Sequence, residues 1–441
     1  MPKRSFGFDA NGGLMVYGAS QLPTNFAECS HRQLQGFPML SLAHFRLQRR
    51  SLRSLIYLSW IYSFVSRAVG AFSQIYIFEL FNSVQLAIIA GIAAFTGIMI
   101  GFCIYGVVAA HYRLNAKHGF LLSFLFTGLG LILLPLANDV PEACGAAAIR
   151  GIGSGLFWLT IHTYELMESS DHERDIYSTF LSAGDQIVTV ASPAFATLLL
   201  WISHHLGFGD FTLLFLAMPP LLLLGLPAVA ALKDYRPAPI GRHDLVHFFA
   251  DRRNQAAQIY LMGGAASHIL QQTVIPLAAI TVLGAAVNVG SFNTVFAIAG
   301  ALALLAVGSR RRPENRLKIF GMSSAVLVAL NLMLGFSMTF ATLIVYTIGA
   351  SITQPIMRVS QHVIDLKTMD SMGHHASDFY PAMILRDVAL WVWRTLAALL
   401  LLVLAGDART GQEVISLGMY FIAGAIVLTS LSARILLTWE R

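Results

Sequence analysis

Charged residues are scarce in this sequence. Asp, Glu, Lys and Arg together make up 12% of its 441 residues, whereas soluble domains contain about 25%. Hydrophobic residues make up 56%, and the mean hydropathy is +0.66. This composition excludes an ordinary soluble protein and indicates a chain that crosses a membrane many times.

Cysteine and several enzyme motifs are also lacking. The three cysteines (Cys29, Cys103 and Cys144) are too few and too far apart for a disulfide framework or a metal cluster. The sequence has no Gly-x-x-x-x-Gly-Lys-Ser/Thr loop, so we expect no direct use of ATP. No nucleophile stands beside a base in a recognisable pattern. We therefore predict neither an enzyme nor a bound cofactor.

Apolar runs recur along the chain at the length needed to cross a bilayer, which is about 20 residues. They predict twelve spans: 55–78, 84–108, 119–137, 144–166, 176–201, 210–232, 256–283, 287–308, 317–339, 341–364, 380–404 and 414–437. The predicted fold is an all-α membrane protein with two pseudo-symmetric six-helix bundles. We divide it into an N-terminal extension (1–53), a first bundle (54–232), a loop (233–255) and a second bundle (256–441).

The second half of the chain repeats features of the first at a shift of 202 residues. Gly308 follows Gly106 at this spacing, and both border polar loops. Asp387 follows Asp185 in the same way, and both lie within apolar runs. Internal repeats with binding sites near the bilayer midplane are typical of secondary carriers.

Basic residues gather on one side of the predicted membrane. The N-terminal segment and the loops after spans 2, 6 and 8 are rich in Lys and Arg, whereas the opposite loops contain Arg409 alone. By the positive-inside rule both termini are cytoplasmic. The sequence pI near 9.3 then reflects contact with anionic lipid, and we expect no nucleic-acid partner. No cleavable signal peptide is visible, and we predict a bacterial inner-membrane protein.

Short motifs resemble those of the major facilitator superfamily. The segment Gly106–Gly119 is similar to its signature loop between helices 2 and 3, although the usual acidic residue is missing. The segment Gly308–Arg316 keeps the glycine and the arginines. Arg150–Gly155 resembles the arginine-and-glycine pattern on helix 4, and Ser192-Pro193 stands where the drug antiporters of the family carry Gly-Pro.

This resemblance covers roughly residues 52–438 and implies two bundles that rock about a central cavity. It also implies that the loops around Gly106, Arg113, Gly308 and Arg312 control the gates. It implies no substrate, because one scaffold in this family serves many functions.

Arg67 and His268 lie at similar depths in spans 1 and 7, with Gln271 one turn further on. An ionisable group at the centre of a span costs at least about 2.5–3.5 kcal/mol, so each is a candidate for function. These residues are candidates for contacting substrate or exchanging protons. Alternatively, Arg67 pairs with a carboxylate and His268 only hydrogen-bonds within the bundle.

Asp185 and Asp387 lie near the middle of spans 5 and 11. Burial and neighbouring cations act on such carboxylates in opposite directions, which suits a group that binds and releases a proton. The alternative is a pair of ion pairs that shape the gates, with Arg358 as a candidate partner for Asp387. Trp391 is a candidate for stacking on the substrate.

Deep cations outnumber deep carboxylates. The five cations are Arg67, Arg150, Arg358, Arg386 and Arg394, and the two carboxylates are Asp185 and Asp387. A surplus of positive charge favours an organic anion or a zwitterion.

Acidic segments with histidines follow spans 4 and 10. His172, His374 and His375 are possible ligands for a transition metal. The alternative is a solvated gate segment that pairs with basic loops, and we assign no metal site.

We interpret the chain as a monomeric secondary active transporter that moves a small organic anion or zwitterion, coupled to protons and embedded in lipid. One alternative is an exporter of amphipathic drugs or lipids. Another is a non-transporting scaffold that recruits partners through its N-terminal arm and acidic segments.

Overall fold

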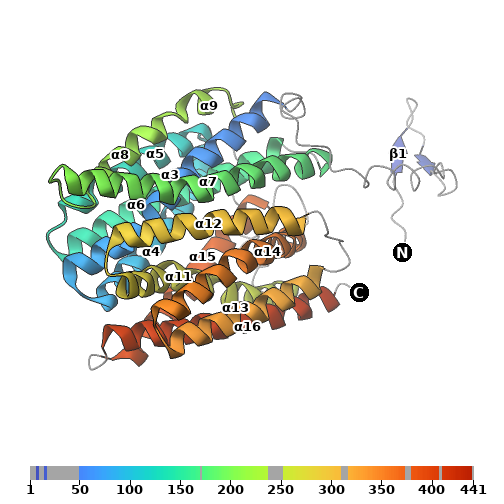
Figure 1. Ribbon diagram of the computed structural model, residues 1–441. Coiled ribbons are helices and arrows are strands. Elements are labelled where there is room, and N and C mark those ends of the chain that lie inside the picture. Colours follow the sequence, from blue (N-terminus) through green and yellow to red (C-terminus); the bar gives the residue numbers. More distant parts are fainter. Residues whose placement is uncertain are drawn as a thin grey trace. The chain divides into compact units, whose positions relative to one another are not determined.

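The computed structural model describes residues 6–8, 14–16, 49–168, 171–236, 252–308, 316–372, 379–406 and 410–439 (Figure 1). The chain divides into two units, Met1–Leu47 and Gln48–Arg441. In the first unit, β1 (Phe6–Phe8) pairs antiparallel with β2 (Leu14–Val16), with Phe6 opposite Val16. This small hairpin is an addition to the all-α fold that we predicted.

The second unit is helical in its described part. Its first half contains α3 (Arg50–Phe81), α4 (Val84–His111), α5 (Lys117–Leu133), a 3-10 turn (Leu134–Leu136), α6 (Val140–Glu168), α7 (Asp171–His205), α8 (Thr212–Leu223) and α9 (Leu226–Ala230). Its second half contains α11 (Arg252–Leu283), α12 (Ala286–Gly308), α13 (Arg316–Phe336), α14 (Phe340–Met372), α15 (Phe379–Ala405) and α16 (Gly411–Trp439).

These helices confirm the predicted fold class. Within the described residues, eleven helical segments are long and apolar enough to cross a membrane, counting Thr212–Ala230 as one. The remaining predicted crossing, 287–308, corresponds to α12, whose described apolar part is shorter, Ala286–Leu302. The sixth crossing is divided between α8 and α9 at Gly225, and Pro227 occupies the first turn of α9, where its missing N–H costs no hydrogen bond.

The ends of the membrane-crossing helices lie at two opposite faces of the helical unit. We call the end at which α3 begins the near face, and the end at which it finishes the far face. The far-face turns are short and locally capped: Ser83 Oγ accepts a bond from Leu86 N, and Asp139 Oδ1 accepts one from Glu142 N. Gly284 joins α11 to α12 with φ +74°, a conformation that favours glycine.

Glycines let α4 and α6 cross at very short range. A Cβ added at Gly97 or Gly101 of α4 would collide with the backbone carbonyl of Ala148 or Ile152 in α6. The reverse holds for Gly151, where a Cβ would collide with the Ala94 carbonyl. Small residues spaced four apart allow such close packing in membrane helices.

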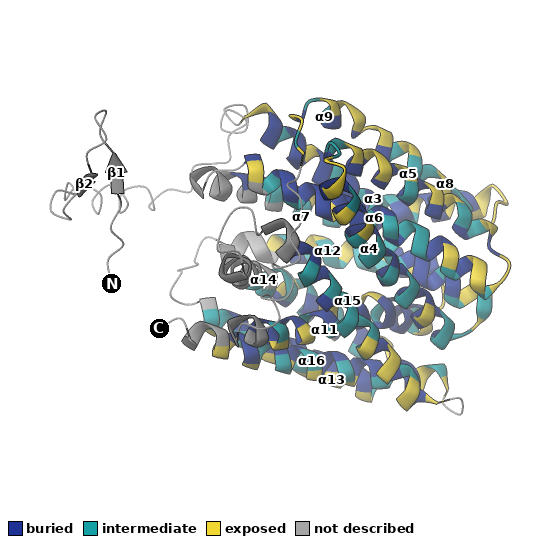
Figure 2. Ribbon diagram, turned by 180° about the vertical axis from the view of Figure 1, so that it is seen from behind, coloured by how far each residue is buried: buried dark blue, intermediate teal, exposed yellow. Residues whose placement is uncertain are grey.

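Each half packs mainly within itself, and the most extensive contacts between the halves are made by three helix pairs. These pairs are α7 with α12, α4 with α15, and α3 with α11. Figure 1 shows α12 lying alongside α7. Buried residues face the interior of the helical unit, whereas exposed apolar residues cover its outer helices (Figure 2), as expected for a protein surrounded by lipid.

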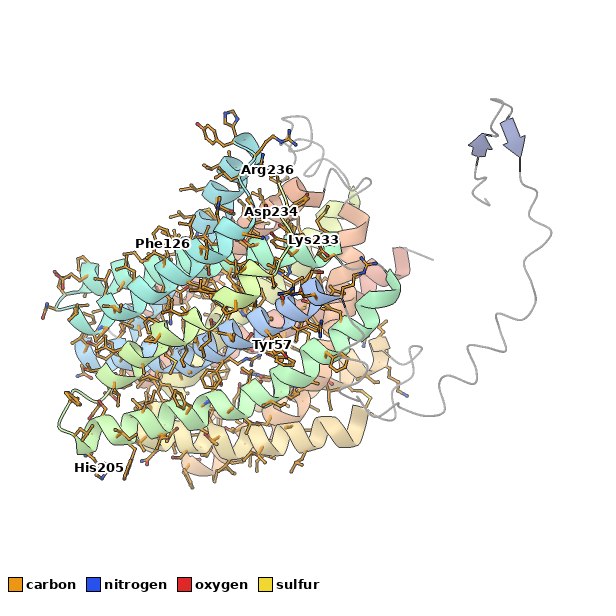
Figure 3. All side chains as sticks on the ribbon, turned by 90° about the horizontal axis from the view of Figure 1, so that it is seen from above. Tyr57, Phe126, His205, Lys233, Asp234 and Arg236 are labelled. Atoms are coloured by element: carbon orange, nitrogen blue, oxygen red, sulfur yellow. The ribbon has the colours of Figure 1, made fainter. Side chains whose placement is uncertain are left out.

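The chain after α9 is fastened to the near face of the first half. The Tyr164 hydroxyl donates to the Lys233 carbonyl at 2.8 Å, and Ala116 N donates to the Tyr235 carbonyl at 2.8 Å. Lys117 Nζ lies 2.8 Å from Asp234 Oδ1 and lowers the pKa of that exposed carboxyl. Figure 3 shows Lys233, Asp234 and Arg236 together, with His205 toward the other end of the helices.

We expect Gly151→Ala to destabilise the protein, because the new methyl group would displace α4. Overpacking of this kind costs about 1–3 kcal/mol. The thermal unfolding temperature of the purified protein in detergent measures the effect.

Gly145→Ala is the matched control on the same helix, since a Cβ there meets no atom within 4 Å. It should leave the unfolding temperature unchanged or slightly raised, because alanine favours helix. Equal losses in both variants would contradict the tight α4–α6 crossing.

Candidate functional site

Arg67 of α3 and Asp185 of α7 form an ion pair within the first half. Arg67 Nη2 donates to both Asp185 oxygens at 2.8 Å. The two side chains remain 32% and 35% exposed. Charged groups at this depth face the protein interior or water rather than lipid. The pair is partly accessible, and Asp185 is charge-compensated by Arg67.

Aromatic side chains position this pair. Trp60, two turns before Arg67 on α3, donates from Nε1 to the Leu181 carbonyl of α7 at 3.3 Å. Its ring occupies the space that a Cβ on Gly184 would need. Because Gly184 directly precedes Asp185, the Trp60 contact fixes the stretch of α7 that carries the carboxylate.

Asp387 of α15 has a different environment. It is 8% exposed, and its Oδ2 has no hydrogen-bond partner among the described residues. Arg394 and Arg386 of the same helix act on it electrostatically as cations, with Arg394 the stronger. Arg394 lies two turns further along the same helix, so both residues share a face of α15.

Arg394 also contacts the first half. Its guanidinium carbon lies 4.8 Å from the centre of the Phe95 ring of α4, a geometry that favours cation–π attraction. His268 of α11 approaches the same ring edge-on, with ring centres 5.6 Å apart. Gln272 Nε2 lies 3.1 Å from His268 Nε2. Phe95 of the first half therefore contacts both Arg394 and His268 of the second half.

Trp391 provides a polar bond between the halves. Its Nε1 donates to Thr96 Oγ1 of α4 at 3.0 Å. Trp391 lies one turn after Asp387 on α15, and Thr96 follows Phe95. The residues Phe95, Thr96, His268, Asp387, Trp391 and Arg394 therefore form a central cluster contributed by α4, α11 and α15.

Arg150 is engaged inside the first half. Its Nη1 donates to Ser73 Oγ at 2.8 Å. It lies within electrostatic reach of the Tyr62 hydroxyl, which is 2.7 Å from Ser154 Oγ. This arginine is part of the packing of α3 against α6.

The acidic segment after span 4 forms a hydrogen-bonded network on α6 and α7. His162 Nδ1 lies 2.9 Å from Glu165 Oε2, and the Tyr177 hydroxyl donates to Glu165 Oε1 at 2.7 Å. Glu168 accepts from Ser51 at 2.7 Å and from Lys233 at 3.2 Å. In the described part of the chain no group of three metal-ligating side chains meets.

The remaining predicted residues are only partly placed. Gly106 packs against Ile384 of α15, and Arg113 is exposed in the turn after α4 with φ 51°. Gly308 is the last residue of α12, and Gln271 is half-buried on α11. Arg312, His374 and His375 lie outside the described residues, as do the side chains of Arg358 and His172.

Sequence reasoning missed Phe95 and Thr96. They are an ordinary aromatic and an ordinary hydroxyl residue within an apolar run, and no charge or motif marks them.

Comparison with known proteins identifies the family of this chain. The family model described as Major Facilitator Superfamily matches residues 55–362. A search of curated proteins found no match. The matched region includes Arg67, Asp185 and His268, whereas Asp387, Trp391 and Arg394 follow it.

We expect the Arg67–Asp185 contact to show in a double-mutant cycle. Arg67→Gln and Asp185→Asn should each lower the thermal stability, and the double variant should lose less than the sum. Coupling between bonded side chains is about 0.5–3 kcal/mol, and partial exposure places this pair toward the lower end.

The Lys117–Asp234 pair is the matched control, since it has the same 2.8 Å separation but an Asp234 side chain 73% exposed. Its coupling should be much smaller because solvent screens it. Strictly additive losses at Arg67 and Asp185 would contradict the pairing.

Proposed function

Because the chain belongs to the major facilitator superfamily, we propose that it is a secondary active transporter coupled to protons. The family makes it a membrane transporter. The finer proposal is that it moves a small organic anion or zwitterion by alternating access.

The observation that carries proton coupling is the contrast between the two repeat-related aspartates. Asp185 is compensated by Arg67 at 2.8 Å. Asp387 is nearly buried and keeps one oxygen without a described hydrogen-bond donor. A carboxylate held in this way gains or loses a proton when its surroundings change, because burial favours the neutral form and a nearby cation favours the charged one.

Alternating access is supported by where the halves touch. Thr197 of α7 and Phe72 of α3 both contact Gly290 of α12, and Gly91 of α4 contacts Thr273 of α11. These residues lie in the far-face portions of their helices, whereas Gly106 of α4 and Ile384 of α15, which also join the halves, lie toward the near face. We propose that bundles 54–232 and 256–441 rock about the central cluster, which breaks the far-face contacts when the far side opens.

The orientation follows from the basic residues. Lys117, Lys233 and Arg236 lie at the near face, whereas the described far-face turns 82–83, 137–139, 206–211, 284–285 and 337–339 contain no Lys or Arg. We propose that the near face is cytoplasmic, with both termini on that side, in a bacterial inner membrane.

We expect Asp387→Asn to abolish proton-driven uptake while substrate exchange continues. The amide cannot release a proton, so the proton and substrate steps would become uncoupled. Proteoliposomes with an imposed pH gradient and an internal pH dye measure proton entry when a mixture of amino acids and organic anions is added.

Asp210→Asn is the control, because it removes an exposed far-face carboxylate. Deletion of residues 1–47 should also leave uptake intact. Unchanged proton entry in Asp387→Asn would overturn the coupling assignment, and loss of function only after the deletion would favour the scaffold interpretation.

A further inference from the structure

We infer that the substrate is a compact zwitterion of the α-amino carboxylate type, bound at the Arg67–Asp185 pair. This inference rests on the proposed transport function and narrows its substrate class. The sequence alone left an anion and a zwitterion open, because five deep cations outnumbered two carboxylates.

The structure shows contacts for three of these deep guanidinium groups. Arg67 pairs with Asp185, and Arg150 donates to Ser73. Arg394 lies over Phe95 and is the strongest cation acting on Asp387. Of these three arginines, Arg67 is the one that a carboxylate holds at hydrogen-bond distance, so the Arg67–Asp185 pair offers both charges at one place.

A paired site discriminates between ligands by their charge. An anion that binds Arg67 would compete with Asp185 and leave a carboxylate uncompensated within the membrane, which is strongly disfavoured. A cation that binds Asp185 would likewise leave the charge of Arg67 uncompensated. A ligand with both charges satisfies both side chains at once.

The geometry of the pair suits a small ligand. Arg67 uses only Nη2 for both Asp185 oxygens, and no described residue bonds to its Nη1 or Nε. About a third of each side chain is accessible. In an α-amino acid the ammonium nitrogen lies about 2.5 Å from the carboxylate carbon. These two charges can therefore bridge partners that are themselves 2.8 Å apart.

Aromatic residues on the two helices that carry the pair suit an apolar side chain on the ligand. Phe64 lies one turn before Arg67, and its ring centre is 5.6 Å from that of Phe195 on α7. Trp60 packs against Gly184, the residue directly before Asp185. We therefore expect apolar and aromatic amino acids to bind more tightly than small or charged ones.

The test is a thermal-shift screen of the full-length protein with the twenty common amino acids. Each one that binds is then compared with its N-acetyl form, which keeps only the anion, and its methyl ester, which keeps only the cation. At 100 times its Kd the zwitterion should raise the unfolding temperature by about 2–5 °C. Both derivatives should bind at least about tenfold more weakly.

Asp185→Asn supplies the sharper test. It frees Arg67 from its carboxylate, so the variant should lose the response to the zwitterion and gain one to the N-acetyl anion. Asp210→Asn is the matched control and should behave as the wild-type protein. This exchange of preference is not expected from a variant that is merely less stable.

The outcomes separate this inference from the proposed function. If anions alone stabilise the wild-type protein and enter proteoliposomes with protons, the zwitterion assignment is wrong and the transporter stands. If no amino acid binds, the assignment is also wrong. If no amino acid or organic anion moves protons into proteoliposomes, the proposed function fails as well.

Discussion

The compensation of charge inside the membrane is the constraint on which this structure depends. An isolated ionised group at the centre of a span costs at least about 2.5–3.5 kcal/mol. Asp185 compensates the charge of Arg67, whereas Arg150 is held by a hydrogen bond to Ser73 and Arg394 by cation–π attraction to the Phe95 ring. Each partner lies on another helix, so helices must approach closely. The glycine crossing of α4 and α6 and the contact of Trp60 with Gly184 make such approaches possible.

Much of the fold follows from the sequence, because a bilayer requires apolar runs of a narrow range of lengths. The predicted span 144–166 is α6, Val140–Glu168, and the predicted span 84–108 is α4, Val84–His111. Span 210–232 is correct in extent but is divided into α8 and α9. Mean hydropathy does not show that division, because the leucines around Gly225 and Pro227 dominate the average over the span.

The partners within the site could not be predicted in the same way. Arg67 and Asp185 are 118 residues apart, and Trp391 and Thr96 are 295 apart. Which residues meet depends on the rotation of each helix about its axis, and a helix that is apolar on every side carries no pattern that records this rotation. His268 illustrates the limit: the repeat places it level with Arg67, and the structure places its ring against Phe95 of α4.

The repeat predicts the depth of each aspartate in its span, whereas the neighbouring side chains determine which cation accompanies it. Asp185 and Asp387 occupy equivalent positions in the two halves, yet a guanidinium holds both oxygens of Asp185 while Asp387 keeps one oxygen without a described donor. Duplication alone would give two similar carboxylates. The arginines that accompany them come from different helices, α3 in one half and α15 in the other. Two positions of one repeated pattern can therefore differ in chemistry, and this difference is the basis for proposing that Asp185 binds a charged ligand and Asp387 exchanges a proton.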